Sequence, residues 1–361
     1  MAHAAHHLAA REALPPRVLI VDDSAVARAV MERIIAATDR FEVAATVSTA
    51  RAALAFLARE RVQFILLDVQ MPDMDGITAL PDLIVAGQGA KVLVVSGTAG
   101  EGATTSVQAL ALGATDTLFK PASGERMGGF GAALVDKLDR LADPAQRGPV
   151  PAAGSRTAAT TPPRPIAVGE EFDVVAIGAS TGGIHALSQL LRAIPPEFRL
   201  PILITQHLPA SFMPYFAAQL AVIANRPCDV AGDRTRLRPG RIVVAPGDAH
   251  MRCVALPDGG AAIRLSSDAS ASGCLPSVDP MFASLASVYG PRMLAIVLSG
   301  MGRDGADGAA CVHRAGGCVV VQDQASSVVW GMPGAVADTG HAHAILPPAA
   351  IGRLAAARQR P

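Results

Sequence analysis

The sequence predicts two α/β domains, each built around an open parallel sheet and joined by an extended linker. From Arg17 onward, short apolar runs alternate with amphipathic stretches, which is typical of repeated β/α units. Between about Pro144 and Glu171 this alternation stops, because the segment is rich in Pro, Gly, Ala and Thr and cannot bury a face. The length of 361 residues is enough for about two domains with separate cores.

The first half of the chain predicts a five-stranded parallel sheet with helices on both faces. The candidate strands are 17–22, 41–47, 62–67, 91–96 and 115–119. In the second half the pattern predicts a doubly wound α/β domain with a β-rich patch over 241–265. Its candidate strands lie near 172–178, 200–206, 241–245 and 293–299, and its helices near 182–193, 304–315 and 333–339. The expected division is a flexible N-terminus (1–15), a first domain (16–142), a linker (143–171), a second domain (172–352) and a C-terminal tail (353–361).

Composition excludes several classes of protein. The formal net charge is zero and no basic stripe is present, which argues against a nucleic-acid surface and a DNA-binding output. We expect no membrane insertion, since no apolar run reaches ~18 residues, and no secretory signal, so a cytoplasmic location is expected. The five cysteines are odd in number and lack CxxC spacing. They are interpreted as buried thiols, and neither a disulfide set nor a zinc site is expected.

Polar residues stand at the ends of four candidate strands in the first half. These residues are Asp22 and Asp23, Asp68, Ser96 and Lys120. The carboxyl ends of parallel strands meet at one edge, where open α/β folds bind ligands. Carboxylates gathered there repel one another unless a cation joins them, and Mg²⁺ prefers oxygen ligands. Each residue alone is more simply a helix cap or a solvated side chain, so the prediction rests on their joint placement.

The stretches VLIVDDS, MPDMDG and LFKP resemble the response-regulator receiver domain, a flavodoxin-like fold. The resemblance implies that Asp68 accepts phosphate from a sensor histidine kinase. It also implies a Mg²⁺ site completed by Asp22, Asp23 and the main-chain carbonyl of Gln70.

By the same resemblance, Ser96 and Lys120 contact the phosphoryl group and propagate the switch. The Lys120–Pro121 peptide bond is expected to be cis, as in the family. Receivers usually carry an aromatic switch residue three positions before the lysine, whereas this chain has Thr117. The route by which the signal is transmitted is therefore expected to differ.

The second half contains a glycine-rich turn between a predicted strand and a predicted helix, Gly178-Ala-Ser-Thr-Gly182. Such a turn presents either a nucleophilic serine or a phosphate site at a helix N-terminus. Ser180 needs a base within reach and a carboxylate to orient that base. The candidate bases are His185, His207, His250 and His313.

His207 is favoured as the base because it ends the strand PILITQH at the same sheet edge as Ser180. His185 and His313 lie on predicted helices and are interpreted as structural or solvated, while His250 lies on a loop. Asp304 follows the strand LAIVLS through a second glycine-rich turn, where it either caps a helix or orients the base.

Six segments together resemble the chemotaxis protein-glutamate methylesterases of the CheB type. These segments are IGASTGG, TQHLPASFMPYFA, VAPGDAHM, SVDPMFASLA, LSGMGRDGADG and QDQASSVVWGMPGAVA, which cover nearly all of 172–346. The resemblance implies Ser180 as nucleophile, His207 as base and Asp304 as orienting acid. It further implies that Thr181 assists the base and that the main-chain N–H of Met301 contacts the oxyanion.

The activities implied are hydrolysis of glutamate γ-methyl esters on methyl-accepting chemotaxis receptors and deamidation of receptor glutamines. They would be controlled through Asp68 by a kinase of the CheA type, with Mg²⁺ in the receiver and no cofactor in the esterase site. In the family, the unphosphorylated receiver covers the esterase cleft. Arg303 stands where many members have Asn.

Two other readings of the residues stay open. One is a receiver that gates a non-catalytic binding module. The other is a dinucleotide-binding oxidoreductase using GASTGG, although that fold needs an acid at the end of its second strand, where this chain has Gln206-His207.

Overall fold

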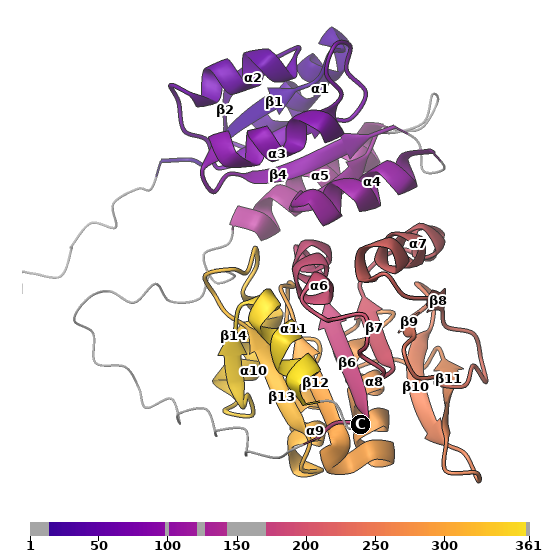
Figure 1. The fold of residues 1–361 in the computed structure, drawn as a ribbon. Helices are drawn as coiled ribbons and strands as arrows, with labels where there is room; N and C mark the ends of the chain where they lie inside the picture. Colours follow the sequence, from indigo (N-terminus) through magenta and orange to yellow (C-terminus); the bar gives the residue numbers. More distant parts are fainter. Residues whose placement is uncertain (1–13, 98–100, 121–126, 143–170, 359–361) are drawn as a thin grey trace, which may run out of the picture.

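The computed structural model describes residues 14–97, 101–120, 127–142 and 171–358. Two α/β domains are present, and in Figure 1 the N-terminal domain lies above the C-terminal one. The N-terminal strands are β1 (Arg17–Val21), β2 (Glu42–Val47), β3 (Phe64–Asp68), β4 (Lys91–Ser96) and β5 (Asp116–Phe119). They pair in parallel in the order β2-β1-β3-β4-β5. The prediction of a five-stranded parallel sheet is confirmed.

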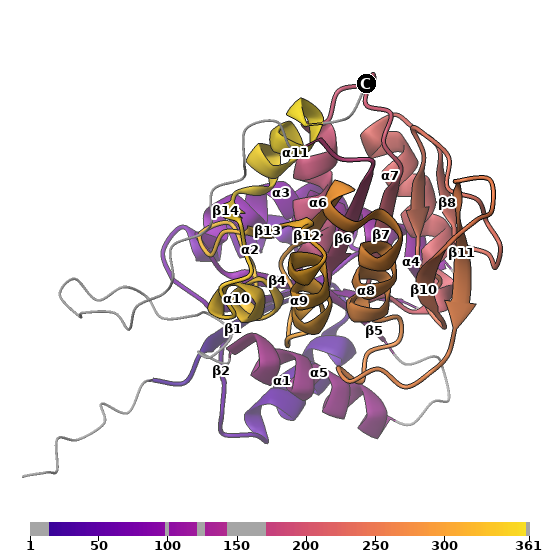
Figure 2. The ribbon, with the colours of Figure 1, turned by 90° about the horizontal axis from the view of Figure 1, so that it is seen from below.

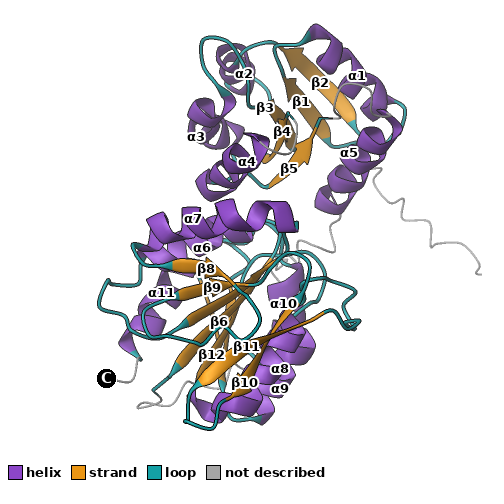
Figure 3. Ribbon diagram, turned by 90° about the vertical axis from the view of Figure 1, so that its right-hand side faces the viewer, coloured by secondary structure: helices purple, strands orange, loops and turns teal. Residues whose placement is uncertain are grey.

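Alternating apolar residues of the strands give this sheet two buried faces. The helices are α1 (Ala25–Ala36), α2 (Ala50–Leu57), α3 (Gly76–Gly87), α4 (Glu101–Leu112) and α5 (Met127–Ala142). Val18 and Ile20 of β1 point into the core under α1 and α5, whereas Leu19 and Val21 point into the core under α2, α3 and α4. Figure 3 shows the sheet between these two helix layers. The successive side chains of a strand point to opposite faces, so uninterrupted apolar runs suit a sheet covered on both sides.

The C-terminal sheet has the strand order β14-β13-β12-β6-β7-β9-β8 and is parallel throughout. Its strands are β6 (Val174–Ala179), β7 (Ile202–Gln206), β8 (Cys228–Val230), β9 (Ile242–Val244), β12 (Met293–Val297), β13 (Cys318–Gln322) and β14 (Ala344–Leu346). A separate antiparallel hairpin, β10 (His250–Ala255) with β11 (Ala261–Ser266), accounts for most of the predicted β-rich patch. The doubly wound prediction is confirmed.

Helices cover both faces of this second sheet. They are α6 (Gly183–Arg192), α7 (Met213–Ala224), α8 (Val278–Tyr289), α9 (Ala306–Arg314), α10 (Gly331–Asp338) and α11 (Pro348–Ala357), and the 3₁₀ turn η2 (Ala210–Phe212) precedes α7. Helices α6, α7 and α11 pack on one face, and α8, α9 and α10 pack on the other, as Figure 2 shows from below.

Several elements were not predicted from the sequence. They are β8, β13, β14, α7, α8 and α11. The apolar run CVVVQ of β13 carried a clear strand signal that the sequence analysis did not use. Helix α11 continues to Ala357, so 353–357 of the expected C-terminal tail are helical. Pro121 and nearly all of the expected N-terminus and linker lie outside the described residues, as does the predicted cis bond.

Candidate active site and phosphorylation site

Ser180, His207 and Asp304 follow three adjacent strands of the C-terminal sheet. Ser180 comes directly after β6 and His207 directly after β7, while Asp304 lies on the turn between β12 and α9. Strand β6 pairs with β7 on one side and with β12 on the other. The connection after β6 leads to β7 on one side, whereas the later strand β12 pairs on the other side. Open α/β sheets bind ligands at such a reversal of strand order, the topological switch point. The fold therefore brings together the three predicted residues.

The turn that carries Ser180 is held by main-chain and side-chain hydrogen bonds. Ser180 N donates to Ser299 O at 3.0 Å, and Gln206 Nε2 donates to Ser180 O at 2.9 Å. Gly182 has φ +75°, and a Cβ there would lie 2.5 Å from the Val328 Cβ. Only glycine satisfies both the left-handed conformation and that close approach. The position of the serine is thus fixed by the backbone.

The His207–Asp304 pair is the central contact of the site. His207 Nε2 lies 2.8 Å from Asp304 Oδ2, and the aspartate is 1% exposed. Asp304 also accepts hydrogen bonds from Ser277 Oγ at 2.7 Å and from Val278 N at 2.8 Å. Burial raises the pKa of Asp304, but the hydrogen bonds from His207, Val278 and Ser277 outweigh it and hold the pKa well below its usual value. Asp304 is therefore an ionised, fully bonded carboxylate.

Burial of the imidazole lowers the pKa of His207, but hydrogen bonding to Asp304 and to Cys274 outweighs burial and raises it to about 9. Because Nε2 faces Asp304, Nδ1 is the ring nitrogen left for proton transfer. Among the described residues, no hydrogen bond joins Ser180 Oγ to His207, although both line the same cavity. Apo sites often have long catalytic contacts that shorten when substrate binds.

The other two predicted residues of this site lie beside the serine turn. Thr181 lines the cavity with Ser180, and its carbonyl accepts a hydrogen bond from Ser299 Oγ at 2.8 Å. Met301 follows Gly300, where an added Cβ would lie 2.9 Å from Ser180 Cβ. This close approach brings the backbone of the β12–α9 turn next to the nucleophile. The roles of Thr181 and Met301 stay predictions.

The sequence offered His250 as a candidate base on a loop, but the structure places it at the start of β10, where it contacts Ser277 behind Asp304, and sequence reasoning missed that arrangement. His250 is 1% exposed; its Nδ1 accepts a hydrogen bond from Ser277 N at 2.9 Å, and its Nε2 lies 2.7 Å from Asp268 O. Ser277 in turn donates to Asp304. His250 thus fixes the main chain of Ser277, which bonds to Asp304. The only sequence signal was its place in a motif, VAPGDAHM.

The remaining candidate histidines lie outside the site. His313 packs beside His341 and His343, with ring centroids 4.8 and 5.4 Å away. His185 Nδ1 lies 3.2 Å from the carbonyl of Ala111 in the N-terminal domain. His185 therefore contacts the other domain, which its sequence position on a helix did not indicate.

The cysteines are free thiols, but the expectation that all are buried is wrong. Cys253 and Cys318 are buried, whereas Cys228, Cys274 and Cys311 are partly exposed. Cys274 lies with His207 and Asp304, and one ligand atom from each lies within 4.8 Å of the others. Linear spacing could not reveal this group, because the three residues come from three distant parts of the chain.

In the N-terminal domain, the buried Asp22 and Asp68 form an ionic group with the partly exposed Lys120. Lys120 Nζ lies 2.8 Å from Asp22 Oδ2 and 2.9 Å from Asp68 Oδ1. Burial raises the pKa of Asp68, and Lys120 only partly offsets this effect. Asp68 is therefore a carboxylate at the carboxyl edge of the sheet whose burial is not fully offset by its partners.

The predicted Mg²⁺ ligands fit a hard cation. One carboxylate oxygen from each of Asp22, Asp23 and Asp68 lies within 4.8 Å of the others. Asp22 Oδ2 is buried and, despite the nearby ammonium, accepts no hydrogen bond of acceptable geometry. An unsatisfied buried carboxylate oxygen is the type of ligand that Mg²⁺ takes. Gln70 follows on the same loop and is exposed.

Ser96 ends β4 and contacts the next helix. Its Oγ lies 3.2 Å from Ser106 Oγ of α4, and both residues are buried. Thr117 lies in β5, paired with Val94, and has no aromatic ring to move between positions. The contact from Ser96 to α4 is therefore the direct link between the expected phosphoryl site and that helix.

Helix α4 also forms the interface with the C-terminal domain. It packs against α6, α7 and η2, and Phe119 of β5 lies 5.3 Å from Phe212, measured between ring centroids. Between the domains lies a cavity of ≈ 40 Å³, lined by Ser180 and His207 and, from the other domain, by Leu110 and Asp116. Such a volume holds little more than water and is too small for a substrate side chain. In this conformation the N-terminal domain narrows access to Ser180, which stays partly exposed.

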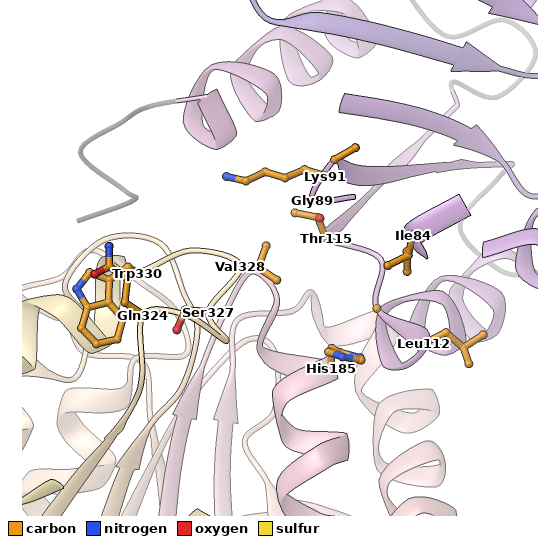
Figure 4. A pocket seen from close by; sticks show the side chains of 12 residues that line it. Ile84, Gly89, Lys91, Leu112, Thr115, His185, Gln324, Ser327, Val328 and Trp330 are labelled. Atoms are coloured by element: carbon orange, nitrogen blue, oxygen red, sulfur yellow. The ribbon is translucent and has the colours of Figure 1, made fainter. Parts of the chain in front are cut away.

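A larger cleft of ≈ 460 Å³ opens beside this cavity at the same interface. Figure 4 shows Leu112 and Thr115 on the N-terminal side facing His185 and Val328 on the other. Val328 also packs closely against Gly182, two residues after the proposed nucleophile. The interface is thus narrow at Ser180 and wider a short distance away.

A carboxylate cluster of the receiver type joined to a Ser-His-Asp group defines a response regulator with a hydrolase output domain. Comparisons agree: the family model described as response regulator receiver domain matches 18–128, and that described as CheB methylesterase matches 175–354. The chain belongs to the CheB methylesterase family. Among curated relatives, the protein-glutamate methylesterase/protein-glutamine glutaminase 1 of Paramagnetospirillum magneticum is 40% identical over 354 residues, which is 92% of this chain and 93% of the relative.

A second relative, named protein-glutamate methylesterase/protein-glutamine glutaminase 2, from Caulobacter vibrioides, is 40% identical and covers 95% of this chain and 99% of its own length. Among solved structures, the CheB methylesterase catalytic domain of Thermotoga maritima is 32% identical, with a TM-score of 0.50. It covers 53% of this chain and 99% of its own. Within the described residues, no helix is long and apolar enough to span a bilayer.

Proposed function

We propose that the chain is a phosphorylation-activated protein-glutamate methylesterase that hydrolyses glutamate γ-methyl esters of chemoreceptors to glutamate and methanol. The observation that carries the proposal is the convergence of Ser180, His207 and Asp304 at the ends of three adjacent strands, with the 2.8 Å bond between His207 and Asp304. Relatives that match over most of this chain bear the corresponding name.

In the proposed reaction, His207 Nδ1 takes the proton of Ser180 while Oγ attacks the γ-carbonyl carbon. The tetrahedral intermediate collapses as the imidazolium returns that proton to the departing methoxide, which leaves as methanol. Water then attacks the acyl enzyme by the same steps and releases glutamate. Asp304 stays ionised throughout, since its three donors favour the carboxylate.

The developing oxyanion would be held by the main-chain N–H of Met301 and by the Ser180 turn, the kind of donor worth about 3 kcal/mol each. Thr181 would assist His207 from the neighbouring position. A receptor glutamine would form the same acyl enzyme with ammonia as leaving group, so we also propose glutaminase activity. The intact hydrogen-bond set of Asp304 favours this enzyme over a non-catalytic binding module.

We further propose that phosphorylation of Asp68 uncovers Ser180. Asp22, Asp23, Asp68 and the Gln70 carbonyl would hold Mg²⁺, which supplies charge neutralisation for the transferred phosphoryl group. Lys120 and Ser96 would bind that group, and Ser96 would then leave Ser106, loosening α4. Because α4 packs against α6 and α7, its movement would open the ≈ 40 Å³ cavity to substrate.

The partners that fit this proposal are methyl-accepting chemotaxis receptors as substrate and a histidine kinase of the CheA type as phosphodonor, in the cytoplasm.

The test is methanol release from methylated receptor by three chains: the unchanged protein, Ser180→Ala and Asp68→Asn. We expect release to stop in Ser180→Ala and to lose its response to a small-molecule phosphodonor in Asp68→Asn. Undiminished release by Ser180→Ala would rule out the nucleophile, and equal rates with and without phosphodonor in the unchanged chain would rule out gating. Labelling by a serine-directed phosphonate separates the enzyme from a binding module.

A further inference from the structure

Cys274 stands beside the proposed triad on a loop that is tightly connected to it. The Cys274 carbonyl accepts a hydrogen bond from Ser270 Oγ at 2.9 Å, and Ser272 Oγ lies 3.2 Å from Ser277 Oγ. Ser277 donates to Asp304 at 2.7 Å. The loop is thus fastened to the carboxylate that orients His207. Its conformation places the thiol of Cys274 in the same group of ligand atoms as His207 and Asp304.

We propose that Cys274, His207 and Asp304 form an inhibitory binding site for a thiophilic divalent cation, Zn²⁺. The donor set is one sulfur, one imidazole nitrogen and one carboxylate oxygen, and these are the ligands that zinc takes in proteins. Three protein ligands leave the fourth tetrahedral position to water. Mg²⁺ and Ca²⁺ prefer sets composed of oxygen, so this site differs in kind from the carboxylate cluster of the receiver.

The geometry needs only a small adjustment to accept the ion. All three ligand atoms lie within 4.8 Å of one another. Two ligand atoms at about 2.0–2.3 Å from a tetrahedral zinc lie roughly 3.3–3.7 Å apart. His207 and Cys274 are partly exposed, so a rotation of either side chain is feasible without disturbing the buried Asp304.

Binding at this site would stop catalysis whichever ring nitrogen is used. Zn²⁺ displaces the thiol proton of Cys274 and, below about pH 9, one ring proton of the His207 imidazolium; both protons pass to solvent, and the ion takes the ring lone pair. If the ion binds Nδ1, it occupies the atom that must accept the Ser180 proton; if it binds Nε2, Nδ1 carries the remaining hydrogen and is no longer a base. The inhibition therefore rests on the proposed function, whereas the binding does not.

The binding is tested on the full chain with Ser180→Ala, which separates it from activity. Zn²⁺ affinity is measured by competition with a chromophoric chelator, and Co²⁺ is used as a spectroscopic substitute. We expect a sulfur-to-cobalt charge-transfer band that disappears in Cys274→Ser and persists in the matched control Cys311→Ser, a cysteine that lies instead beside Arg314. We expect Cys274→Ser to weaken Zn²⁺ binding by more than about 100-fold at this site, since even the loss of an outer-shell partner costs about 10- to 100-fold.

Loss of the band in Cys274→Ser identifies the site, because that variant keeps the other four cysteines and because histidines elsewhere, such as His3, His6 and His7, cannot produce a thiolate band. A band that survives Cys274→Ser, or no Zn²⁺ binding at micromolar concentration, would overturn the inference. In a second arm, Zn²⁺ should inhibit methanol release by the unchanged chain, EDTA should reverse the inhibition, and Cys311→Ser should behave like the unchanged chain. If the chain releases no methanol under any condition yet shows the band, the proposed function fails and the metal site stands.

Discussion

Asp68 and Asp304 are buried carboxylates near the carboxyl edges of two parallel sheets, yet their surroundings shift their pKa values in opposite directions. Asp304 accepts hydrogen bonds from His207, Ser277 and Val278, which lower its pKa despite burial. Asp68 relies mainly on Lys120, and burial raises its pKa. The completeness of the hydrogen-bond set, more than depth of burial, separates a carboxylate that orients a base from one that is free to accept a new group.

The largest expected effect comes from replacing each aspartate by asparagine. Asp304→Asn should lower kcat for methanol release by about 10⁴-fold, since an amide no longer favours the reactive form of the imidazole. Asp68→Asn should leave the basal rate unchanged within about twofold, because Asp68 lies in the other domain. The measurement is methanol release by both variants without phosphodonor. Similar losses of kcat in the two variants would contradict the different roles assigned to the two aspartates.

The variants Asp68→Asn and Asp304→Asn should also differ in their free energy of unfolding at pH 7. Asp68 has a raised folded pKa, so its ionised form opposes folding above that pKa, and Asp68→Asn should keep or raise the free energy of unfolding. Asp304→Asn should lower it by about 2 kcal/mol, because a buried hydrogen-bond set to a charged group is lost. Urea denaturation of both variants, followed for each domain, checks the opposite signs.

The next effect is a pH dependence set by His207. Its pKa is raised to about 9, so the neutral imidazole that can act as a base is scarce at pH 7. Basal methanol release, measured in chelator, should rise by about 50-fold from pH 7 to pH 9 and level above about pH 10. Chemical hydrolysis is subtracted with Ser180→Ala. The free energy of unfolding should change in the opposite direction to the rate. The stabilisation by the His207–Asp304 ion pair is complete below about pH 6.5 and is lost as the pH rises through about 9. A rate that is level from pH 7 upward would contradict the assignment of His207 as the base.

The residues at the strand ends could be predicted from the sequence, whereas the contacts made by loops and by packing between the domains could not. Ser180, His207, Asp68 and Lys120 directly follow apolar strands, so parallel pairing alone brings each set to one edge. The contact of Cys274 with the triad had no such signal, since it depends on a loop whose path is set by serine hydrogen bonds. The covering of Ser180 also depends on packing between domains, through side chains that periodicity assigns only to a core.

The smallest expected effect lies on the route between the two sites. Ser106 Oγ is 3.2 Å from Ser96 Oγ, and in the proposed gating this contact holds α4 in the position that restricts access to Ser180. Ser106→Ala should remove about 1 kcal/mol from the covered state, which corresponds to about a fivefold higher basal rate of methanol release. The phosphorylated rate should change by less than about twofold, because Ser96 has then already left Ser106.

Ser287→Ala on α8 is the matched control, since within the described residues that hydroxyl bonds only to the carbonyl of Ala283 and lies away from the interface. It should leave both rates unchanged. If Ser106→Ala raises basal and phosphorylated rates by the same factor, the serine acts on the esterase site itself and not on its covering. If it raises neither, Ser96 does not transmit the state of Asp68 through α4, and the comparison between the two carboxylates would describe two independent sites. A basal increase confined to the unphosphorylated chain is the result that links them, because only a shift in the covered population produces it.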